Sequence, residues 1–135
     1  MGFFQIIKKL IAPMPGRNLG RNLSLQDKED IRKKWAEIEQ LVRLGRPSGF
    51  KTAILDADKV LDHALKLLGY RGQTMAERMK NIPRDSHERD FFDDMWQAHK
   101  VRNNMVHNME YEVMDFEAKD AVRKFGRVLR ELGAL

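Results

Sequence analysis

The chain has 135 residues, a length that suits a single domain with a hydrophobic core of its own. Hydrophobic residues at 42%, charged residues at 33% and no cysteine exclude a disordered tail, a membrane-spanning chain and a thiol nucleophile, and they fit the cytoplasm. The net charge of +5 indicates an anionic partner such as RNA, DNA or a lipid surface.

Residues 1–23 form a basic arm ahead of the predicted domain. A short amphipathic helix is expected at residues 2–11, ended by the prolines that follow it. The glycine-punctuated loop after it carries Arg17 and Arg21, which are candidate RNA contacts. Residues 1–24 contain no acidic residue and supply four of the five net positive charges. The short helix has two interpretations, namely packing on the domain or a partner chain, and attachment to a membrane surface.

Residues 24–135 are predicted to be helical throughout, because apolar residues recur every three or four positions. The expected helices, caps included, span residues 24–44, 48–68, 74–82, 86–106 and 115–132. Their expected N-caps are the polar residues Ser24, Ser48, Thr74, Ser86 and Asp115. No segment alternates with the period of a strand. We therefore predict an all-α fold, an up-and-down bundle of four to five helices.

The last predicted helix has the clearest apolar stripe. Its members, all expected in the core, are Phe116, Ala121, Val122, Phe125, Val128, Leu129 and Leu132.

Most familiar catalytic patterns are missing from the sequence. It has no glycine-rich phosphate loop, no His-Glu-x-x-His and no nucleophile elbow. Asp56, Asp58 and Asp62 on the second predicted helix could suggest a metal site, but they are expected to face outward beside Lys59 and Lys66. We therefore interpret these three carboxylates as a solvated helix face, and expect neither a metal nor a cofactor.

The fourth predicted helix carries a polar interruption in its apolar stripe. Continuing by three and four residues from Trp96, the stripe meets His99, Arg102 and Asn103 before it resumes at Val106. Polar groups on a core-facing stripe need partners. The interruption therefore predicts a functional site or interface, or else a buried hydrogen-bond network.

Residues 102–107 read Arg-Asn-Asn-Met-Val-His. This segment resembles the signature of the HEPN superfamily, an arginine, a polar residue and a histidine a few positions further on. In that superfamily the signature lies near the end of a late helix in a small all-α bundle. The resemblance extends over residues 24–135 and implies a HEPN-like fold for them.

The resemblance implies a metal-independent endoribonuclease that acts as a homodimer, in the role of a toxin or defence effector. The two motif helices would meet across a two-fold axis, so that each protomer supplies Arg102 and His107 to one composite site. Arg102 would hold the scissile phosphate of RNA. His107 would exchange a proton with the ribose 2′-OH or the leaving 5′-oxygen, and Asn103 would orient the histidine or the phosphate.

Two further features bear on this interpretation. His99, one turn before Arg102, is either an RNA-contacting or supporting residue, or a hydrogen-bonded core histidine. HEPN toxins paired with nucleotidyltransferase antitoxins carry a tyrosine two residues after the motif histidine. Here Met109 occupies that position and the nearest tyrosine is Tyr111, which argues against regulation by adenylylation of that tyrosine and against membership of that toxin subgroup.

Two other functions compete with the ribonuclease. One is a non-catalytic HEPN-like bundle that binds a nucleotide, RNA or another protein, such as an antitoxin or a regulatory protein. The other is a helical interaction module held at a membrane surface by residues 2–11.

Overall fold

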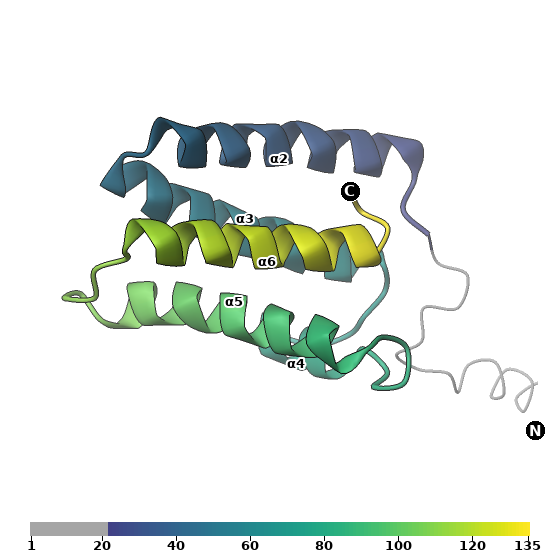
Figure 1. Cartoon of the computed structure of the whole chain (residues 1–135). Helices are drawn as coiled ribbons and strands as arrows, with labels where there is room; N and C mark the ends of the chain where they lie inside the picture. Colours follow the sequence, from purple (N-terminus) through teal and green to yellow (C-terminus); the bar gives the residue numbers. More distant parts are fainter. Residues whose placement is uncertain (1–21) are drawn as a thin grey trace, which may run out of the picture.

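The computed structural model describes residues 22–135, and it confirms the predicted all-α fold. The helices in this range are α2 (Leu25–Leu44), α3 (Pro47–Leu67), α4 (Met75–Lys80), α5 (Arg89–His107) and α6 (Asp115–Glu131). The four long helices run alternately up and down, and the short α4 lies in the connection from α3 to α5 (Figure 1). The predicted helix at residues 2–11, together with Arg17 and Arg21, lies outside the described residues.

Two predicted helix starts are confirmed by side-chain caps. The backbone N–H of Asp27 donates to Ser24 Oγ at 2.9 Å, and the Asp27 carboxylate accepts from the Ser24 N–H at 3.4 Å. At α4 the N–H of Glu77 donates to Thr74 Oγ1 at 3.1 Å. The Glu77 carboxylate accepts from the N–H of Gln73 at 2.7 Å, so the reciprocal bond falls one residue earlier than in a capping box.

Three other predicted starts are wrong by one or two residues. Helix α3 begins at Pro47 rather than after Ser48, because proline has the φ of a first helical turn and no N–H to leave unpaired. Ser86 is held in a turn, where its hydroxyl donates to the Pro83 carbonyl oxygen at 2.5 Å, and α5 begins later. Asp115 is the first residue inside α6, where its negative charge interacts favourably with the positive end of the helix dipole.

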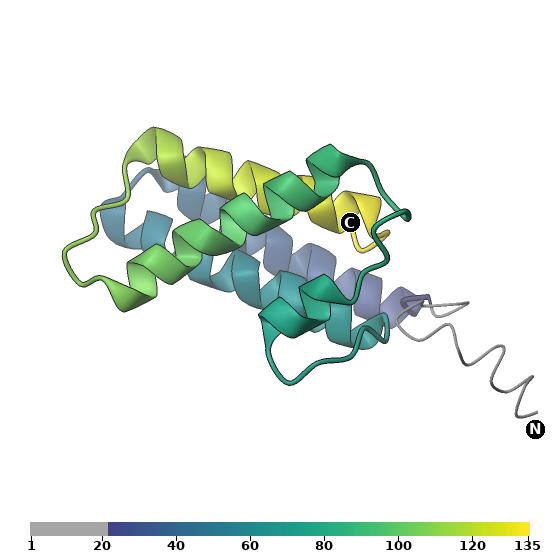
Figure 2. The ribbon, with the colours of Figure 1, turned by 90° about the horizontal axis from the view of Figure 1, so that it is seen from below.

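Helix α3 is the central element of the core. It contacts all four other helices of the described chain. Of these, α5 runs obliquely across the bundle (Figure 2). Several of its buried positions are alanines, which let neighbouring helices approach closely. Its buried residues are Phe50, Ala53, Ile54, Ala57, Asp58, Val60, Leu61, Ala64 and Leu65. Because α3 is covered on more than one side, its buried arc is wider than one apolar stripe.

The apolar stripe of α6 is buried as predicted from Ala121 to Leu129. Phe116 is an error of the prediction, because its side chain is 73% exposed. It lies in the first turn of α6, nine residues before Phe125 and so about 180° away from it, on the face of the helix opposite the buried stripe. No helix in the described part of the chain is long and apolar enough to cross a membrane.

Gly126 lets α6 pack closely against Trp35 of α2. A Cβ at position 126 would lie 2.9 Å from Trp35 Cζ2 and 3.1 Å from an Nη atom of Arg130. Trp35 is buried, and its Nε1 donates to the Glu39 carboxylate at 3.2 Å, so the ring has little freedom to move. Glycine is therefore required here by close approach rather than by backbone conformation.

We predict that Gly126→Ala lowers the free energy of unfolding by about 1–3 kcal/mol, the usual cost of overpacking a core. Denaturant unfolding monitored by circular dichroism measures it. In a Trp35→Phe background, which removes the crowded indole atoms, the same substitution should cost less. An equal cost in both backgrounds would show that the indole is not what makes glycine necessary.

Candidate functional site

Asp58 is buried in the core, contrary to the predicted solvated face. Its side chain is 4% exposed, and it lies on the side of α3 that α5 covers. A helix that buried a single apolar stripe would leave Asp58 in solvent, whereas α3 is enclosed on several sides. Of the other two carboxylates, Asp56 pairs with Lys34 at 3.3 Å and Asp62 pairs with Arg78 at 2.7 Å. Both are half-buried, so these three residues do not form one solvated face.

The buried carboxylate joins α3 to the polar interruption of α5. Asp58 Oδ1 lies 2.7 Å from His99 Nδ1, and Asp58 Oδ2 lies 3.3 Å from Arg102 Nε. A carboxylate can only accept, so Nδ1 carries the hydrogen, and Nε2 is the nitrogen of the ring that faces away from Asp58. Of the two interpretations of the polar interruption, a buried hydrogen-bond network therefore describes His99 and its contact with Asp58.

Arg102 lies at the edge of this network and reaches the surface. Its Nη1 donates to Asn103 Oδ1 at 2.8 Å, and its side chain is 33% exposed. The second terminal nitrogen, Nη2, has no partner among residues 22–135. The guanidinium is therefore held at two points while part of its donor fork stays open, an arrangement that suits an oxyanion.

His107 is not part of this cluster. It is the last residue of α5 and is exposed, and no hydrogen bond or ion pair of the described chain joins it to Arg102. Five residues along a helix rotate a side chain by about 140° from the first and move it about 7.5 Å along the axis. The arginine and the histidine of one chain therefore do not converge on a single point.

A groove of about 340 Å³ opens beside the cluster, between α3, α4 and α5. Its lining residues are Asp58, Lys59, Asp62, Thr74, Met75, Ala76, His99 and Arg102. Arg78 of α4 forms a two-point contact with Asp62, at 2.7 and 3.1 Å, and also donates to the carbonyl oxygen of Gly72 at 2.5 Å. These bonds hold α4 as a wall of the groove.

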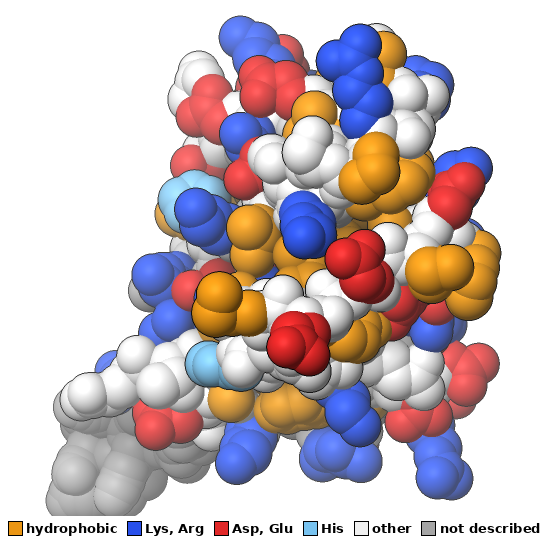
Figure 3. Space-filling model, turned by 90° about the vertical axis from the view of Figure 1, so that its left-hand side faces the viewer, with side chains coloured by type: hydrophobic (Ala, Val, Ile, Leu, Met, Phe, Trp, Pro, Cys, Tyr) orange, Lys and Arg blue, Asp and Glu red, His pale blue; other side chains and the backbone are white. Residues whose placement is uncertain are grey.

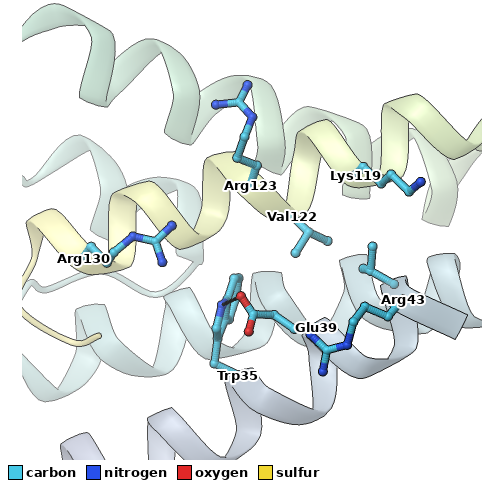
Figure 4. Close-up of a pocket in the computed structure, with 8 residues that line it drawn as sticks. Trp35, Glu39, Arg43, Lys119, Val122, Arg123 and Arg130 are labelled. Carbon is cyan, nitrogen blue, oxygen red and sulfur yellow. Dashed lines mark hydrogen bonds between the residues drawn. The ribbon is translucent and has the colours of Figure 1, made fainter. Parts of the chain in front are cut away.

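A second hollow, of about 300 Å³, lies between α2 and α6. Trp35 and Val122 face it, and cationic side chains surround it (Figure 4). In Figure 4 Arg123 points away from α2, while Lys119 and Arg130 lie at opposite ends of the hollow. Arg123 also pairs with Asp120 at 2.7 Å. The cations do not converge, so this hollow is a weaker candidate than the groove beside Asp58.

Met109, which occupies the position of the tyrosine of the HEPN toxin subgroup, is 95% exposed. The Tyr111 hydroxyl donates to the Glu117 carboxylate. Partial burial and this carboxylate raise the pKa of Tyr111 above its ordinary value. The only tyrosine near the motif is thus held against the start of α6.

Among residues 22–135, no group of three or more histidines and carboxylates is arranged to hold a metal ion. Sequence reasoning did not find Asp58 as a member of the site. The sequence does contain a signal for it. Asp58 interrupts the apolar spacing of α3, as His99 and Arg102 interrupt that of α5, and polar residues on two buried helix faces can be partners.

We predict that Asp58→Ala lowers the free energy of unfolding by about 3–5 kcal/mol, because it leaves a buried histidine and an arginine without their carboxylate. Asp56→Ala on the same helix is the matched control, and we expect a loss below about 1 kcal/mol. Urea unfolding of both variants measures the difference. Equal losses would mean that the buried carboxylate contributes no more than a surface ion pair.

Comparison with protein-family models, with curated proteins and with solved structures gives no match for this chain.

Proposed function

We propose that the protein is an endoribonuclease of the HEPN type, in which the ribose 2′-OH attacks the scissile phosphate. The observation that carries the proposal is the arginine of the Arg-x4-His segment. Arg102 is fixed by Asp58 and Asn103, while its free Nη2 faces no partner within residues 22–135. A guanidinium held in this way can stabilise negative charge that builds up on a phosphate oxygen.

The chemistry needs a phosphate-binding cation and groups that exchange protons near neutral pH. Arg102 supplies the first, and histidines supply the second. The attacking nucleophile belongs to the RNA, so the protein itself provides only positioning, charge and proton transfer. Asn103, which accepts from Arg102 at 2.8 Å, keeps the guanidinium from rotating.

The separation of Arg102 and His107 on α5 supports a site shared by two copies of the chain. In a two-fold dimer, the histidine at the end of one α5 can approach the arginine of the other. The end of the bundle that carries His107 also exposes apolar side chains, namely Val106, Met109, Met114 and Phe116. We call these four residues the apolar end. Figure 3 looks onto this end and shows hydrophobic side chains at its surface among charged ones.

We predict that the purified protein cleaves single-stranded RNA in the presence of EDTA and leaves 2′,3′-cyclic phosphate ends. Arg102→Ala and His107→Ala should each lower the rate at least about 100-fold, as expected for loss of a charge-stabilising or proton-transferring group. Arg43→Ala on α2 is the control and should keep the rate. Gel analysis of end-labelled RNA measures cleavage. Intact RNA at high protein concentration would contradict the proposal, and binding without cleavage would favour the non-catalytic module.

A mixing experiment tests whether the site is shared. Equal amounts of Arg102→Ala and His107→Ala, each inactive alone, should together regain about one quarter of the wild-type rate, because half of the randomly formed dimers are mixed and each has one intact site of two. No recovery after verified subunit exchange would place both groups in one protomer.

The apolar end should stabilise the dimer. We predict that Phe116→Asp shifts the protein toward monomer in analytical ultracentrifugation, because a carboxylate would be buried in the interface. Leu25→Asp is the matched control, since Leu25 is also exposed but lies at the start of α2, at the opposite end of the bundle (Figure 1). A dimer that resists Phe116→Asp would exclude this end as the interface.

A further inference from the structure

His99 is a buried titratable group to which the mechanism above assigns no step. Its side chain is 9% exposed, and its Nδ1 is bound to Asp58. The other ring nitrogen, Nε2, has no hydrogen-bonding partner within the described chain. Buried polar atoms nearly always have a partner, so an open Nε2 beside a groove indicates a ligand or water there.

The ring lies where a nucleotide bound by Arg102 would reach it. His99 and Arg102 are three residues apart on α5, so they share a face of that helix, and both contact the same carboxylate. Both also line the groove between α3, α4 and α5. A phosphate bound at Arg102 would therefore place its sugar near His99.

The charges around the groove favour an anion. Lys59 and Arg102 are its cations, and Lys59 has no ion-pair partner among residues 22–135. Asp62 is paired with Arg78 and Asp58 with Arg102, so the two carboxylates face three cations. No other charged side chain lines the groove, because Thr74, Met75 and Ala76 complete its wall. Its volume of about 340 Å³ lies at the small end of ligand sites and suits one nucleotide.

We propose that this groove binds the nucleotide on the 5′ side of the scissile phosphate, and that His99, oriented by Asp58, is the general base. This assignment rests on the proposed function, and it divides the two proton transfers between two histidines. His99 of the chain that supplies Arg102 activates the ribose, and His107 of the second copy serves as the acid.

The proton transfers balance as follows. The 2′-OH gives its proton to Nε2 of neutral His99 while its oxygen forms a bond to phosphorus. The bond from phosphorus to the 5′-oxygen breaks, and that oxygen takes a proton from protonated His107. The products are a 2′,3′-cyclic phosphate and a free 5′-OH, with His99 protonated and His107 neutral. Exchange with water restores both histidines.

The groove can be tested without turnover by NMR of the histidine rings in the full-length protein, titrated with uridine 3′-monophosphate. We expect saturable shifts of the His99 signals, abolished by Arg102→Gln. The signals of His63, which is exposed on α3 and does not line this groove, should stay unchanged. Unchanged His99 signals at saturating nucleotide would overturn the proposal.

The role as base is tested by the pH dependence of RNA cleavage. A general base acts only without its proton and a general acid only with it, so the wild-type rate should fall at both low and high pH. His99→Gln should be slowed at least about 100-fold and lose the fall at low pH, whereas His107→Gln should lose the fall at high pH. A purely structural His99 would instead lower the rate equally at every pH, which would overturn the assignment.

Asp58→Asn covers the case in which His99→Gln fails to fold, because it keeps the size of the side chain and one acceptor oxygen. Loss of the carboxylate makes a protonated His99 less favourable, so the fall at low pH should move to lower pH. An unshifted profile would contradict the positioning role of Asp58. Nucleotide-induced His99 shifts in a protein that cleaves no RNA would refute the ribonuclease and the base, and leave a nucleotide-binding groove.

Discussion

The buried carboxylate of Asp58 is the constraint on which the arrangement of α3 and α5 depends. A carboxylate removed from water needs opposite charge and hydrogen-bond donors, and both come from one face of α5 through His99 and Arg102. These contacts set the register of α5 against α3, because a shift by one residue would rotate both donors away from the carboxylate. The same contacts leave one nitrogen of each donor open.

The remaining packing supports this polar contact. Helix α4 is joined to α3 through Arg78 and Asp62 and forms the wall of the groove that His99 and Arg102 line. On the other side of α3, helix α6 packs into the apolar core and, through Gly126, against Trp35 of α2. An apolar bundle thus encloses a small group of polar residues that are fixed by hydrogen bonds and ion pairs, as a binding or catalytic site requires.

The two halves of the Arg-x4-His segment have different surroundings. Arg102 belongs to the interior network, whereas His107 ends α5 beside exposed apolar side chains. In a dimer joined at that end, burial of these apolar groups and approach of the second histidine would occur together. Under this proposal the active site would form only when the dimer forms, because each arginine would need the histidine of the other copy.

The helices and most of the apolar faces that build the bundle can be predicted from the order of the residues. Local rules of periodicity and capping place Ser24 and Thr74 at helix starts and bury the stripe from Ala121 to Leu129. Periodicity assigns each helix one buried face, and it fails where tertiary packing differs. Phe116 is exposed because it lies nine residues before Phe125, about 180° around the helix, on the face opposite the buried stripe.

Which residues meet at the candidate site, and at what distances, depends on how the helices pack. His99, Arg102 and Asn103 could be identified because they interrupt an apolar stripe, and His107 because residues 102–107 resemble the HEPN signature. Asp58 was assigned to solvent, because a single helix cannot reveal how many neighbours enclose it. The number of helices around α3, and the pairing of one carboxylate with donors 41 and 44 residues away, are properties of the folded chain that no local spacing encodes.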